Sequence, residues 1–267
     1  MKYISTRGEA EELSFEEVLL SGLARDGGLY VPKQWPKLSF NELELLGGYS
    51  YQDIAFKIMK PFIGSSFSDE EFKGMIVSAY ASFNHDAICP LVQLSNDHFL
   101  LELFHGPTLA FKDVAMQLIG QMLDNILRKT DSRATVVAAT SGDTGSAAME
   151  AFCNSSYVDV FILFPEGRIS EVQRRQMTTL DKPNIHALAV KGDFDDCQAV
   201  VKKMFNNFKF RDRVRLTGVN SINWARIMSQ IVYFFSSALC LGAPYKKVSF
   251  TVPTGNFGDI FAAYAAK

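Results

Sequence analysis

The chain has 267 residues, and its 27 Lys and Arg against 29 Asp and Glu give a net charge of −2 at pH 7. This near balance does not suggest the long basic face of a nucleic-acid-binding protein or the acidic tail of a disordered one. With 48% hydrophobic and 21% charged residues, the composition excludes disordered and collagen-like chains and fits a folded protein of one or two domains.

The four cysteines lie far apart in the sequence, with no CxxC pair and no histidine at a metal-ligand spacing. We therefore expect reduced thiols of a cytoplasmic protein, and no metal site, at Cys89, Cys153, Cys197 and Cys240. The first residues, MKYISTRGEAEELSFEE, show neither the apolar stretch of a secretory signal nor an Arg-rich transit pattern.

Residues 1–84 are predicted to be mainly helical, because capping signals recur along them. In a capping box, a Ser at the helix start and a Glu three residues later satisfy each other's backbone N–H groups. The boxes pair Ser14 with Glu17, Ser39 with Glu42 and Ser68 with Glu71, with a weaker version at Ser50 and Asp53.

Two apolar runs, residues 87–94 and 98–104, flank Ser95-Asn96-Asp97 and predict a hairpin or a pair of strand-like segments. A helix over 112–129 is expected next, because its apolar residues recur at helical spacing, and a strand over 134–139 follows it. From there, strands over 158–164, 185–190, 214–219 and 248–252 alternate with helices that include starts at Ser170 and Asp193. This alternation predicts parallel sheets of α/β type.

Residues 227–245 form an uncharged run of 19 residues, which reaches the length of a membrane span. Its serines, glutamine, glycine and proline favour a buried helix instead, so we predict no membrane contact. The last residues, 259–267, are predicted to form a helix without a stop signal, so we expect a chain that is cut within an element.

Lys112 lies in the first turn of its predicted helix, within HGPTLAFKD. An ammonium group there opposes the positive end of the helix dipole, and Ala110 and Phe111 beside it are apolar, so both effects lower its pKa. The resulting neutral amine is the form that Schiff-base chemistry requires. The alternative is a solvated lysine beside Asp113.

Two glycine-containing turns each follow a predicted strand and precede a helix. Exposed N–H groups at such a turn suit a carboxylate or a phosphate, although many such turns hold no ligand. The first turn holds Thr140, Ser141, Gly142, Asp143, Thr144 and Gly145, and the second holds Pro253, Thr254, Gly255, Asn256, Phe257, Gly258 and Asp259. A reactive lysine with two anion-binding turns fits an aldehyde cofactor with a phosphate, pyridoxal 5'-phosphate, and a substrate with a carboxylate.

Six segments, in this order, resemble those of the threonine synthase family: HGPTLAFKD, ATSGDTGSAA, GRISEVQRRQMTT, KGDFDDCQ, VNSINWARI and VPTGNFGD. The opening YISTRG and DGGLYVP are also similar, so that the resemblance runs from residue 3 to residue 259. It implies a pyridoxal-phosphate enzyme related to the tryptophan synthase β chain, a lyase of amino-acid biosynthesis that turns O-phospho-L-homoserine and water into L-threonine and phosphate.

The resemblance also implies roles for single residues. Lys112 would hold the cofactor as an aldimine and act as the general base. Cofactor contacts are expected from Asp143, Gly255, Asn256, Phe257, Gly258 and Asp259. Substrate contacts are expected from Thr140, Ser141, Gly142, Thr144 and Gly145, with the substrate phosphate held by Arg174, Arg175, Ser221 or Asn223. For these last four, ordinary helix charges and caps are an equal alternative.

The family's fold implies a helical N-terminal region, residues 1–97, then a smaller α/β domain, 98–212, and the start of a larger αβα domain, 213–267. Family members continue well past the phosphate loop, so we expect this chain to be C-terminally truncated, with apolar surface uncovered around residues 227–241 and little or no activity alone. Two other readings stay open: a different pyridoxal-phosphate lyase or dehydratase, and a fragment that acts only as a binding module. The expected partner is a small-molecule substrate, and no nucleic acid is expected to bind. The sequence does not decide between a monomer and a homodimer.

Overall fold

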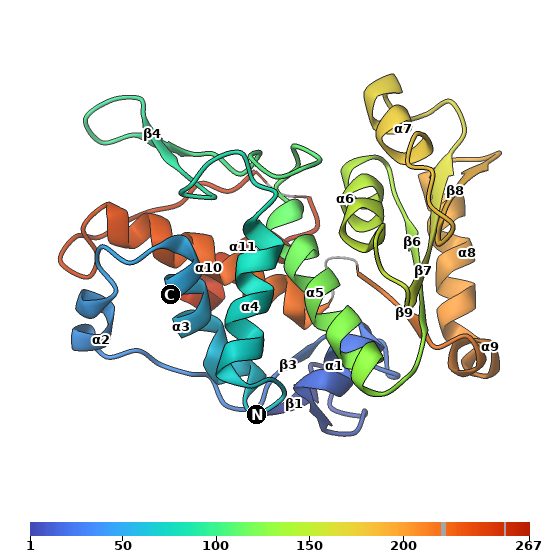
Figure 1. Ribbon diagram of the computed structural model, residues 1–267, viewed down its shortest axis with the longest axis horizontal. Coiled ribbons are helices and arrows are strands. Elements are labelled where there is room, and N and C mark those ends of the chain that lie inside the picture. The colour runs from blue at the N-terminus through green and yellow to red at the C-terminus, as the bar shows by residue number, and fades with distance from the viewer. Residues whose placement is uncertain (220–222, 254) are drawn as a thin grey trace.

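The computed structural model describes residues 1–219, 223–253 and 255–267. Its main feature is a four-stranded parallel sheet in the order β8-β7-β6-β9, on the right of Figure 1. The strands are β6 (Ala134–Ala139), β7 (Val158–Pro165), β8 (Ile185–Val190) and β9 (Leu216–Thr217). The predicted α/β class is confirmed, with strands at 134–139 and 185–190 as expected. The predicted strand over 214–219 is shortened to two residues, because Arg215 has a left-handed φ of 47° that extended structure does not allow.

The two faces of this sheet are covered by different helices, as alternating side chains show. Val136 and Val160 point into the large core shared with α5 (Asp113–Lys129) and α6 (Asp143–Phe152). Val137 and Leu163 point to the other face, where they form a smaller core with α8 (Phe194–Asn206). The sheet is therefore a middle layer between helices, as crossovers between parallel strands require.

The N-terminal region contains four helices: α1 (Phe15–Ser21), α2 (Phe40–Leu45), α3 (Tyr51–Ile63) and α4 (Asp69–Tyr80). The three predicted capping boxes are present, and Ser50 caps α3. The same region also holds a small antiparallel sheet, β2-β1-β3, that we did not predict. Its strands are β1 (Lys2–Ser5), β2 (Leu13–Ser14) and β3 (Tyr30–Pro32), and Tyr3 pairs with Pro32, a long-range contact that local patterns do not encode.

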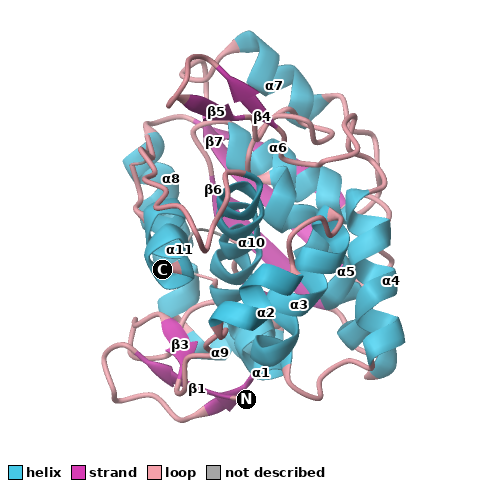
Figure 2. Cartoon of the chain, turned by 90° about the vertical axis from the view of Figure 1, so that its left-hand side faces the viewer, coloured by secondary structure: helices cyan, strands magenta, loops and turns pink. Residues whose placement is uncertain are grey.

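The predicted hairpin is confirmed as β4 (Leu91–Gln93) paired with β5 (Phe99–Leu101), shorter than its apolar runs. Figure 2 shows this hairpin and the small N-terminal sheet at opposite ends of the molecule, with helices between them.

Helix α10 (Trp224–Cys240) lies in the large core, against α3, α5 and α11 (Gly258–Ala266). The expectation of uncovered surface around residues 227–241 was wrong for most of this segment, because those helices bury residues such as Ile227, Ile231 and Tyr233. Within the described part of the chain, no helix is long and apolar enough to cross a membrane.

One predicted strand is missing: residues 248–252 are not paired with any described residue. A strand is held by hydrogen bonds to a neighbouring strand, so an apolar run without such a partner does not become one. The remaining helices are α7 (Glu171–Thr178), which follows Ser170 as predicted, and α9 (Phe208–Arg213).

Candidate active site

A cavity of about 520 Å³ lies where α5, α6 and α11 begin, between α8 and α10. It brings together the three segments that the sequence analysis singled out, although Lys112 and Asp259 lie 147 positions apart in the sequence. Its walls are formed by Phe111, Lys112, Ala138, Ala139, Thr140, Ser141, Thr144, Phe194, Gln198, Val201, Lys202, Arg226, Gln230, Pro253, Gly255, Asn256, Gly258 and Asp259.

Lys112 is the residue before α5, and only 16% of its side chain is exposed. Its Nζ lies 3.3 Å from Asp143 Oδ2 and 4.4 Å from the centre of the Phe111 ring. Burial lowers the pKa of Lys112, Asp143 opposes this, and the nearby Arg226 lowers it further. The lowered pKa of Lys112 agrees with the sequence prediction. The predicted contribution of Phe111 has the opposite sign, because the face of its ring favours a cation.

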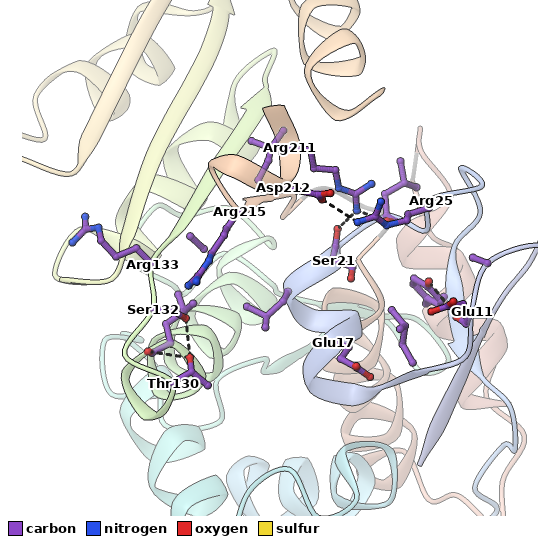
Figure 3. A pocket seen from close by; sticks show the side chains of 18 of the residues that line it. Glu11, Glu17, Ser21, Arg25, Thr130, Ser132, Arg133, Arg211, Asp212 and Arg215 are labelled. Carbon is purple, nitrogen blue, oxygen red and sulfur yellow. Dashed lines mark hydrogen bonds and ion pairs between the residues drawn. The ribbon is translucent and has the colours of Figure 1, made fainter. Parts of the chain in front are cut away.

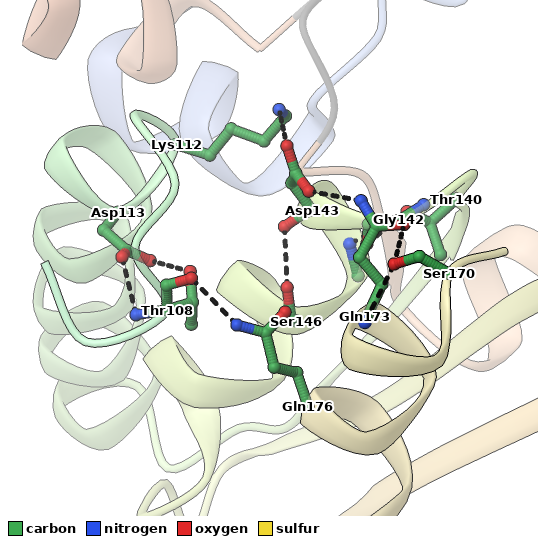
Figure 4. A network of polar contacts seen from close by, with 11 residues as sticks. Thr108, Lys112, Asp113, Thr140, Gly142, Asp143, Ser146, Ser170, Gln173 and Gln176 are labelled. Carbon is green, nitrogen blue, oxygen red and sulfur yellow. Dashed lines mark hydrogen bonds and ion pairs between the residues drawn. The ribbon is translucent and has the colours of Figure 1, made fainter. Parts of the chain in front are cut away.

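Asp143 joins Lys112 to helix α7 (Figure 4). Gln173 Nε2 donates a hydrogen bond of 2.7 Å to Asp143 Oδ1, while Oδ2 faces Lys112. Burial opposes ionisation of this carboxyl, but the Gln173 amide and the Lys112 ammonium outweigh it and keep the pKa of Asp143 below its ordinary value. Both partners of the ion pair therefore carry shifted pKa values.

The turn before α6 is partly closed on itself. Thr140 Oγ1 accepts hydrogen bonds from the N–H groups of Gly142 and Gly145, at 3.0 and 3.1 Å, and donates to the Gly142 carbonyl. These two N–H groups and the Thr140 hydroxyl thus bind one another, and neither glycine lines the cavity. Ser141 and Thr144 are the side chains of this turn that remain available to a ligand.

The turn before α11 is open toward the cavity. Gly255, Asn256, Gly258 and Asp259 line it, whereas Phe257, with a left-handed φ of 57°, is 64% exposed and lies outside the lining. Within the described residues, the backbone N–H groups of Gly255, Asn256 and Phe257 have no hydrogen-bond partner. Unpaired N–H groups at the start of a helix attract a phosphate or another anion.

Arg226 is a cavity residue that sequence reasoning missed. It is 4% exposed, its Nη1 reaches the Val219 carbonyl at 3.4 Å, and its Nε has no partner within the described part of the chain. Burial lowers the pKa of Arg226 to about 10, against the opposing effects of Tyr233 and Asp259. The sequence did contain a signal for Arg226, because it is the single charged residue of the otherwise uncharged α10 segment. A charge that is buried in such a helix requires a ligand or a partner.

Asp259, in the first turn of α11, also lines the cavity. It accepts a hydrogen bond from the Tyr233 hydroxyl of α10. Burial raises the pKa of Asp259, although Tyr233, Arg226 and Lys112 all favour its ionised form. The cavity therefore combines the cations of Lys112 and Arg226 with the half-buried carboxylate of Asp259, close enough to influence one another.

The predicted ligands of the substrate phosphate are not gathered in this cavity. Arg174 and Arg175 are exposed on α7, and both bind Glu171. Asn223 is fully buried, caps α10 by accepting from the Ala225 N–H, and donates to backbone carbonyls. Ser221 lies outside the described residues. For the first three, the structure provides partners within the chain.

A larger cleft of about 1000 Å³ lies between the N-terminal region and α9 (Figure 3). Four arginines and four acidic residues line it, so its charges balance. Arg25 binds Asp212 at 3.0 Å, Arg133 binds Asp159 outside the cleft, and Arg211 donates to the carbonyls of Ser21 and Leu23. Because most of these charges already have partners, this cleft has weaker features of an anion site than the cavity at Lys112.

Comparison with known proteins identifies the family of the chain. Residues 87–267 match the family described as "Pyridoxal-phosphate dependent enzyme", and residues 2–80 match "Threonine synthase N terminus". The chain belongs to the family of pyridoxal-phosphate dependent enzymes.

This pyridoxal-phosphate family member is similar to threonine synthases over its whole length. It is 55% identical to that of Pseudomonas aeruginosa, covering 100% of this chain and 57% of the relative, and 45% identical to that of Saccharomyces cerevisiae, covering 99% and 55%. The crystal structure of pyridoxal-phosphate-bound threonine synthase from Brucella melitensis matches with a TM-score of 0.94 and 58% identity, over 100% of this chain and 57% of that one. The chain thus spans slightly more than half the length of these relatives.

The residues of this family member fit the cofactor that the family requires. A buried lysine with a lowered pKa can hold an aldehyde, unpaired backbone N–H groups at the start of α11 can hold a phosphate, and both line one cavity. Buried Arg226, whose Nε has no partner among the described residues, adds a donor for a second anionic group.

Proposed function

We propose that this chain provides the reacting lysine and the ligand-binding turns of a threonine synthase, which converts O-phospho-L-homoserine and water into L-threonine and phosphate. The observation that carries the proposal is the position of Lys112: a buried amine with a lowered pKa, in one cavity with two helix-start turns. Similarity to threonine synthases over the whole chain supports this substrate among those of pyridoxal-phosphate enzymes.

In this proposal, each wall of the cavity has a separate task. The N–H groups of Gly255 and Asn256 bind the cofactor phosphate, and Ser141 and Thr144 bind the substrate carboxylate. The cofactor supplies, when bound, an electron-withdrawing ring that stabilises negative charge at the substrate α-carbon.

Lys112 has two roles in this reaction. Its neutral amine would hold the cofactor by its aldehyde group and so anchor it. With substrate in the cavity, the same Nζ would take the substrate α-proton as a general base, because it stays within the cavity. The buried setting that lowers its pKa serves both roles, since each requires the uncharged amine.

We assign the substrate phosphate to Arg226 in place of the exposed Arg174. The Nε of Arg226 has no partner in the described ranges, and a phosphate would give it a charge-assisted hydrogen bond. Burial makes such a bond stronger than one at the surface. Arg174, by contrast, is bound to Glu171 through two hydrogen bonds, of 2.8 and 2.7 Å.

Borohydride trapping tests the assignment of Lys112. The chain is mixed with pyridoxal phosphate, reduced, digested and analysed by mass spectrometry. We expect the adduct at Lys112 and its loss in Lys112→Met, with little at Lys202, the other lysine of the cavity wall. An adduct spread equally over the lysines, or absent, would refute the proposed cofactor site.

Product analysis then tests the reaction. Phosphate and threonine are measured after incubation with phosphohomoserine, and ammonia and keto acids after incubation with serine or threonine. Release of phosphate together with threonine supports the proposal, whereas keto acids from serine would identify a dehydratase. Because the chain spans 57% of the Pseudomonas aeruginosa relative, the same assay also measures how much activity these 267 residues carry alone.

We also propose a cytoplasmic location and a small-molecule substrate as the ligand. The four cysteines are unpaired in the structure, and two of them, Cys89 and Cys197, are buried. Unpaired thiols support a reducing compartment.

A further inference from the structure

Two glutamines on one face of α7 bind the two turns that carry the Lys112–Asp143 pair. Gln173 Nε2 donates to Asp143 Oδ1 at 2.7 Å, and Gln176 Nε2 donates to the Thr108 carbonyl at 3.0 Å. Figure 4 shows both side chains pointing from α7 toward the starts of α5 and α6. Helix α7 therefore connects the reacting lysine to the carboxylate that faces it.

The two oxygens of Asp143 are divided between two partners. The shorter contact goes to the neutral amide of Gln173, at 2.7 Å, and the longer one goes to the ammonium of Lys112, at 3.3 Å. Other lysine–carboxylate pairs of the described chain are closer, such as Lys60 with Asp69 at 2.8 Å and Lys129 with Glu71 at 2.7 Å. The Lys112–Asp143 contact is thus the longest lysine–carboxylate ion pair among the described residues.

Gln173 is itself fixed at its other end. Ser170, the N-cap of α7, donates from Oγ to Gln173 Oε1 at 3.0 Å and accepts from the Gln173 backbone N–H at 3.2 Å. The amide orientation follows, because an ionised carboxylate can only accept and therefore requires the NH₂ side of the amide. Gly142 leaves the space for this contact, since a Cβ there would lie 2.3 Å from Gln173 Nε2.

We propose that Gln173 is a positioning residue that restrains the Asp143 carboxylate from a closer ion pair with Lys112 and so keeps the Lys112 amine reactive. The inference rests on the proposed function, in which Lys112 is the reacting amine. Gln173 acts through Asp143, and it does not line the cavity.

The physical reason is a competition between burial and the ion pair. Burial favours the neutral amine, whereas a carboxylate favours the ammonium, more strongly at shorter distance. The other charged groups near Lys112 are Asp113 on α5, Arg226 on α10, Asp259 on α11 and Lys202 on α8, and a change at Gln173 alters none of them. Closing the pair from 3.3 Å to the 2.8 Å of Lys60 and Asp69 would raise the pKa of Lys112 by on the order of half a pH unit.

The test measures the pKa of Lys112 directly, in the chain without cofactor. Trace acetylation by acetic anhydride is quantified at Lys112 by mass spectrometry across pH, with exposed lysines as internal references. Gln173→Met removes the donor and keeps the length of the side chain, so we expect the midpoint at Lys112 to rise by about half a unit. Gln173→Asn, which is too short to reach Asp143, should shift it in the same direction and serves if Gln173→Met unfolds.

The matched control is Val172→Met, the same new side chain on the same helix at a position that is 69% exposed. It should leave the midpoint unchanged. The second control is a double-mutant cycle: in an Asp143→Asn background, Gln173→Met should no longer shift the midpoint, because the carboxylate on which it acts is gone.

An unchanged or lowered midpoint in Gln173→Met overturns the inference, and so does an equal shift in the Asp143→Asn background. These results are independent of borohydride trapping. A chain that shows the Gln173 effect but gives no Lys112 adduct keeps the positioning contact and loses the proposed function. A chain that gives the Lys112 adduct without the Gln173 effect keeps the proposed function and loses the positioning contact.

Discussion

Asp113 accepts two hydrogen bonds from Thr108, one from its backbone N–H at 2.8 Å and one from its hydroxyl at 2.7 Å. Asp113 is fully buried, and burial raises its pKa although both Thr108 bonds favour the ionised form. Gly106 permits the approach, because a Cβ there would lie 2.4 Å from the Asp113 Cβ. The loop that leads to Lys112 is therefore folded around the residue that follows it.

Thr108→Val tests this contact, because valine keeps the shape of threonine and removes the hydroxyl. We expect the free energy of unfolding in urea to fall by about 1–3 kcal/mol, the value of a hydrogen bond to a buried charged group. Thr178→Val is the control, since that hydroxyl bonds to a helix carbonyl at an exposed position, and it should cost less than about 0.5 kcal/mol. Equal losses in the two variants would contradict a special role for Asp113.

Two helical glycines predict opposite effects of the same substitution. Gly74 in α4 is exposed and has no atom within 4 Å of a built Cβ, so Gly74→Ala should stabilise the chain by about 0.5–1 kcal/mol. Gly120 in α5 meets the Ala151 carbonyl at 2.6 Å, so Gly120→Ala must push α5 and α6 apart and should cost about 1–3 kcal/mol. Thermal unfolding of both variants gives the comparison, and a stabilised Gly120→Ala would show that the two helices are less tightly packed.

The lowered pKa of Lys112 predicts a pH-dependent stability. Between the lowered pKa and the ordinary value of 10.5, the folded chain binds fewer protons at Lys112 than the unfolded chain, so this residue makes the chain more stable as pH rises. Lys112→Met removes that contribution. Urea unfolding from pH 7.5 to 10 should therefore show the parent chain gaining stability relative to the variant, and a difference independent of pH would contradict the shift.

Replacing Arg226 should affect the stability of the chain and its phosphate binding differently. Its buried charge has an Nε without a partner within the described residues, so the cost of burying the guanidinium offsets its contacts and Arg226→Met should leave the ligand-free chain about as stable as before. The same variant should bind inorganic phosphate about tenfold more weakly or worse, measured by calorimetry. Arg175→Met, at a residue whose side chain is 70% exposed, is the control and should change neither value appreciably. Unchanged phosphate affinity in Arg226→Met would place the anion elsewhere.

Elements that depend on neighbouring residues were predicted well. The boxes at Ser14, Ser39 and Ser68 are local hydrogen-bond patterns, and the strands at 134–139 and 185–190 are short apolar runs between turns. Elements that depend on distant partners were not. The small N-terminal sheet requires pairing of Tyr3 with Pro32, and residues 248–252 have the composition of a strand but no paired neighbour within the described chain.

The same distinction holds for the site. Lys112 and the turns at 140–145 and 255–259 could be found because glycines, hydroxyls and a lysine at helix starts have local physical meaning. Gln173 could not, since its role arises only when α7 lies beside the start of α6, 30 residues earlier in the sequence. The sequence analysis selected the neighbouring Arg174 as a phosphate ligand because of its charge. In the structure, α7 directs the Gln173 amide inward to Asp143, whereas the Arg174 guanidinium binds Glu171.

Helices α5, α6 and α11 begin at the cavity, so three positive helix ends surround one small volume. Each of these helices places a single aspartate in its first turn, Asp113, Asp143 and Asp259. The buried guanidinium of Arg226 lines the same cavity. A bound anion would be attracted by these helix ends and by the guanidinium. It would then stabilise the folded cavity as well as take part in the reaction.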